Sequence, residues 1–188
     1  MRRADGWLPH VRPGFWYDLD VLAVGAMRID RNESVVHVSR RGQPLPGEMS
    51  NRMTRDEIAS HFAWWAIIPA PLFLSCDIGR IDDFTLSLVT NDDLIEINQD
   101  YPAKPATFED VDGGKRRIWR RELSDGRKVL AFFNLADDGE WQVSHSLGGA
   151  FAVRDVFAGV DMGTLDRVEA SLPVHAARVF LLGVAGSR

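Results

Sequence analysis

Two aspartates stand two residues apart at the end of an aromatic stretch, where carboxylates could do chemistry. The stretch from Phe15 to Gly25 reads F-W-Y-D-L-D-V-L-A-V-G, with Asp18 and Asp20 near its centre. Aromatic and β-branched residues favour a strand up to about Trp16, so both carboxylates are predicted where that strand gives way to a loop. Barrel enzymes keep catalytic groups at such strand ends, which makes the two a candidate catalytic pair. The alternative is local: Asp18 caps a turn and Asp20 binds nearby backbone amides.

The elements that would position these residues include a predicted helix and a predicted strand. Thr54 and Glu57 have the spacing of a capping box, so a helix is expected to begin there. Apolar residues then recur at helical spacing and form a stripe that is typical of a core-facing helix. They are Ile58, Phe62, Trp65 and Ala66. Prolines end the helix, and the run Pro71–Asp77 has the length and apolar continuity of a buried parallel strand.

The next segments continue the alternation of helix and strand. Asp82 or Asp83 can cap a helix over Phe84–Val89, and Leu94–Asp100 is predicted as a further extended run. The order of strand, helix, strand, helix and strand or loop is typical of an α/β fold. A polar loop over Arg28–Asn51 interrupts it and is either a solvated excursion or a binding loop.

The pattern changes at Tyr101–Pro105, and we therefore place a domain boundary between residues 103 and 104. The Asp125-Gly126 pair predicts a hairpin between strands Arg117–Glu122 and Lys128–Asn134. Further strands are expected over Glu140–Ser144, Ala152–Phe157, Arg167–Leu172 and Ala176–Leu182, with Gly148-Gly149 as a turn before the second of these. Short strands separated by turns indicate a small antiparallel β-sandwich.

Composition limits the classes of function. The 188 residues carry a formal net charge of -5, which excludes the electrostatic footprint of a general nucleic-acid binder. No apolar run reaches the about 18 residues of a membrane span, and Met1-Arg2-Arg3 precedes no apolar segment of a signal peptide. The single Cys76 demands no oxidising compartment. We expect a soluble chain without a membrane partner, in a compartment that the sequence leaves undetermined although it favours the cytoplasm.

Other candidate residues have structural explanations. The five histidines lack metal-ligand spacing and no glycine-rich phosphate loop occurs, so we expect no metal and no cofactor. Lys115–Arg117 with Arg120 and Arg121 form a basic run, which we interpret as a solvated edge strand. Trp119 and Trp141 could pack in the core or stack on a sugar ring.

Three segments resemble one enzyme family. Residues 55–77 contain H-F-A-W-W-A-I-I-P-A-P-L-F-L-S-C-D, which resembles the H-x-x-L-W-A-I-x-x-A-P-L-x-x-x-x-D pattern of α-galactosidase-type glycoside hydrolases, family 27 of clan D. Residues 91–100, N-D-D-L-I-E-I-N-Q-D, are similar to that family's N-x-x-V-I-x-x-N-Q-D. Residues 16–22, W-Y-D-L-D-V-L, are similar to its W-N-D-P-D-M-L at the seventh barrel strand. Tyr17, Leu19 and Val21 depart from this last motif.

The resemblance implies both a fold and an activity. The fold is α/β plus all-β: the last two or so βα units of a (β/α)8 TIM barrel in residues 1–103, then a C-terminal antiparallel β-sandwich in residues 104–188. The activity is retaining hydrolysis of O-glycosyl bonds, which needs a nucleophile and an acid/base carboxylate. In the family both follow earlier strands, so we expect no catalytic residue in this chain and no activity of the chain alone. Asp20 and Val21 are implied to line the sugar pocket, with Trp16 beside them and Asp18 as a support.

The partners follow from the same resemblance. The substrate is expected to be an α-galactoside or a related sugar, and the identity of that sugar stays open. A barrel fragment should leave Phe62, Trp64, Trp65, Leu72 and Phe73 partly exposed, ready for a missing N-terminal barrel segment or for self-association. The alternative functions are a non-catalytic carbohydrate-binding module with Trp119 or Trp141 as its platform, or one half of a split enzyme.

Overall fold

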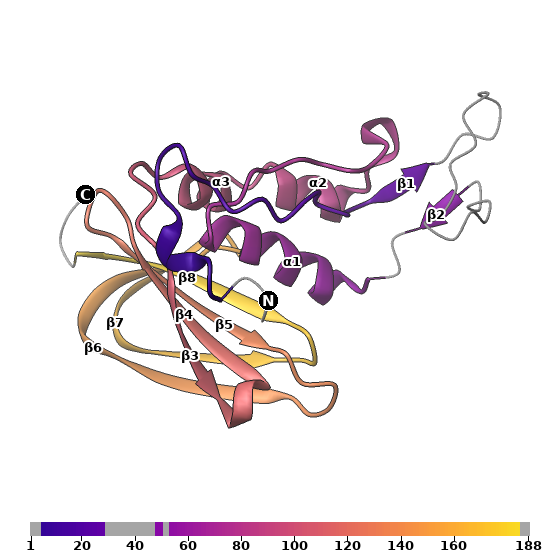
Figure 1. The fold of residues 1–188 in the computed structure, drawn as a ribbon. Coiled ribbons are helices and arrows are strands. Elements are labelled where there is room, and N and C mark those ends of the chain that lie inside the picture. Colours follow the sequence, from indigo (N-terminus) through magenta and orange to yellow (C-terminus); the bar gives the residue numbers. More distant parts are fainter. Residues whose placement is uncertain (1–4, 29–47, 51–52, 185–188) are drawn as a thin grey trace.

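A layer of short helices packs on a curled antiparallel sheet (Figure 1). The computed structural model describes residues 5–28, 48–50 and 53–184. Its helical elements are η1 (Leu8–His10), α1 (Arg55–Ile67), η2 (Ile78–Arg80), α2 (Asp83–Val89), α3 (Asp92–Gln99) and η3 (Asp112–Gly114). Its strands are β1 (Ala26–Arg28), β2 (Glu48–Ser50), β3 (Thr107–Val111), β4 (Arg116–Glu122), β5 (Lys128–Asn134), β6 (Trp141–Asp155), β7 (Val160–Leu172) and β8 (Ala177–Val184). Among the described residues, no helix is both long and apolar enough to span a membrane.

The segment around Leu22, which the resemblance places at the seventh barrel strand, and the predicted strand Pro71–Asp77 meet in a single parallel bridge. The Leu22 amide donates to the Phe73 carbonyl at 2.7 Å, and the Ser75 amide donates to the Leu22 carbonyl at 3.0 Å. The predicted strand up to Trp16 is wrong, because Phe15 pairs only with Arg12 across a tight turn. Most of the predicted polar loop, residues 29–47, lies outside the described residues, and its ends form the antiparallel pair β1 and β2.

Helix α1 begins at the predicted capping box. The Glu57 amide donates to the Thr54 hydroxyl, and the Thr54 amide donates to the Glu57 carboxylate at 2.7 Å. Eight of its thirteen residues are buried, so the helix is covered on most of its surface. The expected exposure of Phe62, Trp64 and Trp65 is therefore wrong: they are buried in a core that the helices and the sheet share.

The predicted extended run before the β-rich part is instead helix α3. The Asn91 side-chain oxygen accepts from the Leu94 amide at 2.9 Å and caps this helix, only two residues after α2 ends at Val89. Asp92 and Asp93 then stand in the first turn, where negative charge is favourable. Asp82, as predicted, caps α2 by accepting from the Thr85 amide at 3.0 Å.

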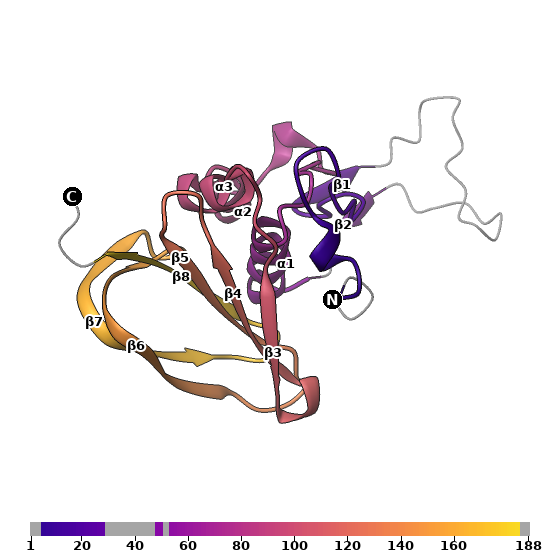
Figure 2. The same ribbon diagram turned by 60° about the vertical axis from the view of Figure 1, so that its left-hand side comes forward.

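The β-rich part is one hydrogen-bonded sheet folded into two layers. Its order is β3-β4-β5-β8-β6-β7, with antiparallel neighbours throughout. The predicted hairpin joins β4 and β5. The predicted turn at Gly148-Gly149 is wrong: β6 runs through it with a register shift between Ser146 and Phe151. Because β6 pairs with β8 only from Phe151 onward, its first half can cross over the sheet as a second layer (Figure 2).

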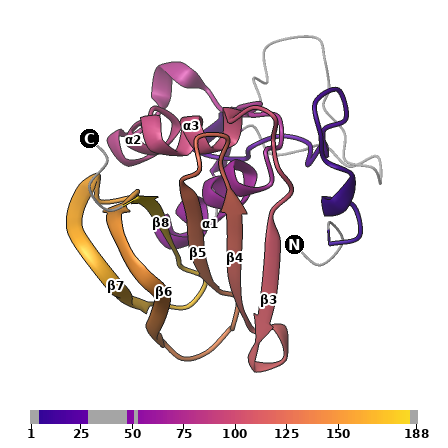
Figure 3. The same cartoon turned by 90° about the vertical axis from the view of Figure 1, so that its left-hand side faces the viewer.

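The middle of the sheet is buried on both faces. Val129, Ala131 and Phe133 of β5 pack into a core shared with α1, while Leu130 and Phe132 pack between the two layers of the sheet. Figure 3 shows β3, β4 and β5 side by side below the helices, with β6 and β7 curving away from them. The predicted domain boundary between residues 103 and 104 stays a prediction, and the main core extends across it.

A pH-dependent contact joins the start of α1 to the turn before β8. His175 Nδ1 lies 2.9 Å from Glu57 Oε1, and the Ser60 hydroxyl donates to the His175 carbonyl at 2.6 Å. The Thr54 amide, and more weakly His175, holds the pKa of Glu57 below its ordinary value of 4.5, although partial burial opposes them.

We therefore expect Glu57→Gln to flatten the pH dependence of stability at acidic pH. A lowered folded-state pKa contributes stability that is present above 4.5 and is lost as the pH falls below it. Urea unfolding of both proteins between about pH 5 and about pH 3 should show the wild-type advantage shrinking as the pH falls. Exposed Glu169 on β7 offers a control, because Glu169→Gln should leave the pH dependence of the free energy of unfolding as it is in the wild type.

Candidate functional site

The two aspartates of the opening stretch have different environments. The Asp20 amide donates to Asp18 Oδ1 at 2.8 Å, so Asp18 caps a turn, as the local alternative predicted. Asp20 itself is exposed, and its carboxylate accepts no hydrogen bond from any residue that the structure describes. Its backbone has φ +72°, a left-handed conformation that side-chain-bearing residues rarely adopt. The stretch therefore holds one engaged carboxylate and one free carboxylate in a strained loop.

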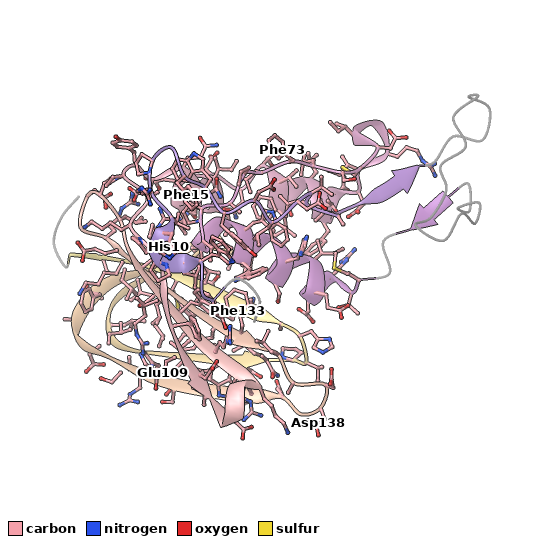
Figure 4. The ribbon with its side chains drawn as sticks, in the orientation of Figure 1. His10, Phe15, Phe73, Glu109, Phe133 and Asp138 are labelled. Atoms are coloured by element: carbon pink, nitrogen blue, oxygen red, sulfur yellow. The ribbon has the colours of Figure 1, made fainter. Side chains whose placement is uncertain are left out.

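Val21 lies on the uncovered face of the bridged segments. Leu22 is fully buried against the helices, and adjacent side chains in an extended segment point to opposite faces. Val21 is accordingly exposed, and so is Phe73 across the bridge, at 61%. Figure 4 shows Phe73 on the side of the helical layer that faces away from the sheet. The predicted exposure is confirmed for Phe73 and, in part, for Leu72.

Trp16 lies in a separate place, at a pocket of about 380 Å³. The pocket is lined by Trp16, Pro69, Ala70, Pro71, Asn98, Gln99, Asp100 and Tyr101. Its proline residues precede the parallel bridge, so it opens at the amino-terminal end of these two segments. Asp18, Asp20 and Val21 do not line it. Trp16 is thus not brought together with the aspartates in one described pocket.

Sequence reasoning missed a buried arginine behind this pocket. Arg121 Nη1 donates to the Ile97 carbonyl at 2.6 Å, and Nη2 lies 3.5 Å from Asp100 Oδ2. Burial lowers the pKa of Arg121 to about 10, and Asp100 opposes that shift. The guanidinium therefore stays charged at neutral pH, and it connects the ends of α1 and α3 to the sheet.

The interpretation of the basic run as a solvated edge strand is wrong, because β4 lies between β3 and β5 and two of its arginines are buried. Arg117 and Arg121 are buried, on the same face of β4 as Trp119. Arg117 binds Asp5 through two bonds of 2.9 Å and Asp110 at 2.6 Å. The alternation of residues 117, 119 and 121 around a tryptophan was the signal that could have revealed this.

The tryptophan platforms of the alternative function receive no support. Trp119 is fully buried, with its ring 4.9 Å from that of Phe108. Trp141 is partly buried, and its ring lies 5.7 Å from that of Phe132. A stacking platform needs an open ring face, which Trp119 lacks, so the core-packing alternative is correct for Trp119.

The chain matches two family models in succession. Residues 47–100 match the model described as Alpha galactosidase A, and residues 113–182 match the Alpha galactosidase C-terminal beta sandwich domain. The chain belongs to the α-galactosidase-like glycoside hydrolases of family 27. It corresponds to their C-terminal part, and its fold is the end of a TIM barrel followed by a β-sandwich.

Individual family members agree with this assignment. The chain is 26% identical over 184 residues to an alpha-galactosidase of Oryza sativa subsp. japonica, covering 95% of this chain and 38% of that protein. It is 30% identical over 133 residues to alpha-galactosidase 2 of Arabidopsis thaliana, covering 69% of this chain and 26% of that protein. A GH27 β-L-arabinopyranosidase from Geobacillus stearothermophilus superposes with a TM-score of 0.83 at 23% identity, covering all of this chain and 41% of that one. The chain thus spans well under half the length of these relatives.

The strained conformation of Asp20 gives a test of whether stability or function requires the aspartate. Asp20→Gly should leave the urea midpoint equal to or above that of the wild type, because glycine adopts a positive φ without a steric penalty. Asp20→Val should lower the free energy of unfolding by about 1–2 kcal/mol, because a β-branched residue is strained there. Equal destabilisation by both substitutions would show that the carboxylate itself stabilises the fold.

Proposed function

We propose that residues 1–188 form the C-terminal portion of a retaining α-galactosidase-like glycoside hydrolase and contribute one wall of its sugar pocket. Asp20 and Val21 line that wall and Asp18 supports the loop, whereas Trp16, predicted beside them, lies at the separate pocket and is left out of the proposed wall. The observation that carries the proposal is the free Asp20 carboxylate on a left-handed backbone. Backbone strain of this kind clusters at ligand-binding positions, and no described residue donates a hydrogen bond to the carboxylate that would offset it.

The proposed role of Asp20 is to bind sugar hydroxyls. An exposed carboxylate with both oxygens free accepts two hydrogen bonds from neighbouring hydroxyl groups. One Asp18 oxygen accepts the Asp20 amide, which suits the proposed role of Asp18 as a support of the loop. Retaining hydrolysis requires one carboxylate to attack the anomeric carbon and another to protonate the leaving oxygen. We assign both of these to barrel segments outside residues 1–188.

The proposed partner is the rest of such a barrel. Val21, Phe73 and Leu74 present exposed apolar side chains on the two bridged segments. Neighbouring barrel strands would cover these side chains. The substrate is an α-galactoside or a related sugar, by analogy with the named activities of the family members.

Reconstitution of hydrolysis tests the proposal. The chain alone is expected not to release nitrophenol from 4-nitrophenyl α-D-galactopyranoside. Co-expression with the barrel segments of a family member that carry its two catalytic carboxylates should restore turnover, and Asp20→Ala should abolish it. Asp18→Ala should retain part of the activity. Turnover by the unaccompanied chain that is lost on Asp20→Ala would overturn the assignment of the catalytic groups elsewhere.

A further inference from the structure

The β-sandwich contains its own pocket, remote in sequence from the aspartate loop. It has a volume of about 670 Å³ and lies where the first half of β6 leaves β8 and crosses over β4 and β5. A volume of this size is within the range of pockets that hold small organic ligands. Its lining comes from the start of β3 and from β4, β5, β6 and β8 together with Lys104 and Pro105 before β3.

The floor of this pocket is apolar. Leu130 and Leu182 belong to the core between the two layers of the sheet, and Leu147 and Phe151 are packed against that core. Leucine side chains offer no hydrogen-bond partner, so a sugar hydroxyl buried among them would stay unsatisfied. The floor therefore fits the hydrocarbon part of a ligand better than it fits a carbohydrate.

The rim is cationic although the whole chain is acidic. Lys104, Arg120 and Lys128 line the pocket with one carboxylate, that of Glu122. Lys104 pairs with Glu122, and Arg120 pairs with Glu109 at 3.2 Å. Both pairs are largely exposed, so a ligand could replace either carboxylate at little energetic cost.

Lys128 is an exposed cation at the rim of the pocket. Its ammonium lies 5.3 Å from the centre of the Phe151 ring, and it forms no ion pair with any residue that the structure describes. His145 stands on the opposite strand, with its ring 5.5 Å from that of Phe132. Burial, and then Arg120, lowers the pKa of His145 below its ordinary value, although Glu109 opposes the shift.

We propose that this pocket binds an amphiphilic carboxylate, with its hydrocarbon chain on Leu130, Leu147 and Leu182 and its carboxylate between Lys128 and Arg120. Apolar area is buried on the floor, and the carboxylate gains charge-assisted hydrogen bonds at the rim. His145 lines the same pocket, and its imidazole can form a further hydrogen bond with the head group.

Calorimetric titration of the 188-residue chain with octanoate at pH 7 tests the site. Octanoate should bind with one-to-one stoichiometry, and octanamide, which has the same chain without the charge, should bind at least about tenfold more weakly. Lys128→Gln should weaken octanoate binding about five- to tenfold. Lys115→Gln removes an equally exposed lysine outside the pocket and should change the affinity less than about twofold.

Two further variants locate the binding. Leu147→Glu should abolish it, since a carboxylate would then occupy the floor, whereas Phe73→Ser on the uncovered barrel face should leave it unchanged. Circular dichroism establishes that each variant is folded. Equal affinity for octanoate and octanamide, equal effects of Lys128→Gln and Lys115→Gln, or loss of binding on Phe73→Ser would each overturn the proposal.

Discussion

Replacing Arg121 with methionine is expected to lower the free energy of unfolding by about 3–5 kcal/mol. The Arg121 side chain is fully buried, and the Asp100 side chain beside it is 7% exposed. Arg121 also donates to carbonyls at the ends of α1 and α3, which have no partner within their own helices. Its removal leaves a buried carboxylate with less compensation and several buried carbonyls unsatisfied.

Arg120 supplies a matched control for this prediction. It is the adjacent residue on β4, its side chain is 42% exposed, and it pairs with Glu109 at the surface. Arg120→Met should therefore cost less than about 1 kcal/mol. The measurement is the urea midpoint at pH 7 for both variants. Similar losses would contradict the proposed role of Arg121 as the buried link between helices and sheet.

A double substitution separates charge from hydrogen bonding at this link. Asp100 Oδ1 accepts from the Ser124 amide at 2.9 Å and from its hydroxyl, contacts that asparagine can retain. Adding Asp100→Asn to Arg121→Met removes the buried charge that would otherwise lack its partner. Recovery of about 1–2 kcal/mol would measure the electrostatic share of the loss. The remainder reflects the unsatisfied helix carbonyls.

Truncation of Phe133 is the second substitution with a large expected effect. Phe133 of β5 is fully buried in the core shared with α1, so Phe133→Ala should cost about 3–5 kcal/mol through lost burial and a residual cavity. Phe73→Ala makes the same chemical change at an exposed position and should cost less than about 0.5 kcal/mol. Figure 4 labels both residues, Phe133 at the sheet and Phe73 on the far side of the helices.

Urea unfolding measures the stability of the two variants, and sedimentation measures their self-association. Phe73→Ala should also reduce any self-association, because it removes exposed apolar surface. A negligible loss of stability at Phe133 would contradict the core that the helices and the sheet share, and a large loss at Phe73 would contradict the exposure of that side chain.

Features set by neighbouring residues were predictable from the sequence. The capping box at Thr54 and the Asp-Gly hairpin between β4 and β5 depend on contacts within four residues, and both were confirmed. The prediction for α3 was wrong because Asn91 can end one helix and also cap the next. The alternation with Trp119 indicated the buried face of Arg121, but its partners could not be predicted, because they come from helices more than twenty residues away.

The candidate site, like the fold, was predicted only in part. Sequence spacing and the family resemblance selected the segment from Trp16 to Val21. The role of Asp18 as a turn cap was predicted as the local alternative, whereas the positive φ of Asp20 was not predicted, because it depends on the backbone path of the loop. The pocket in the β-sandwich was missed altogether, since its walls come from strands far apart in the sequence.

The two-sided burial of β5 has a consequence for how this chain unfolds. A strand that packs against α1 on one face and between the sheet layers on the other cannot lose either neighbour without exposing its own apolar side chains. The helical layer and the sheet are therefore coupled into one cooperative unit, although they derive from two family domains. Slow hydrogen exchange should accordingly extend from the β5 amides into α1, with both segments opening at the same free energy.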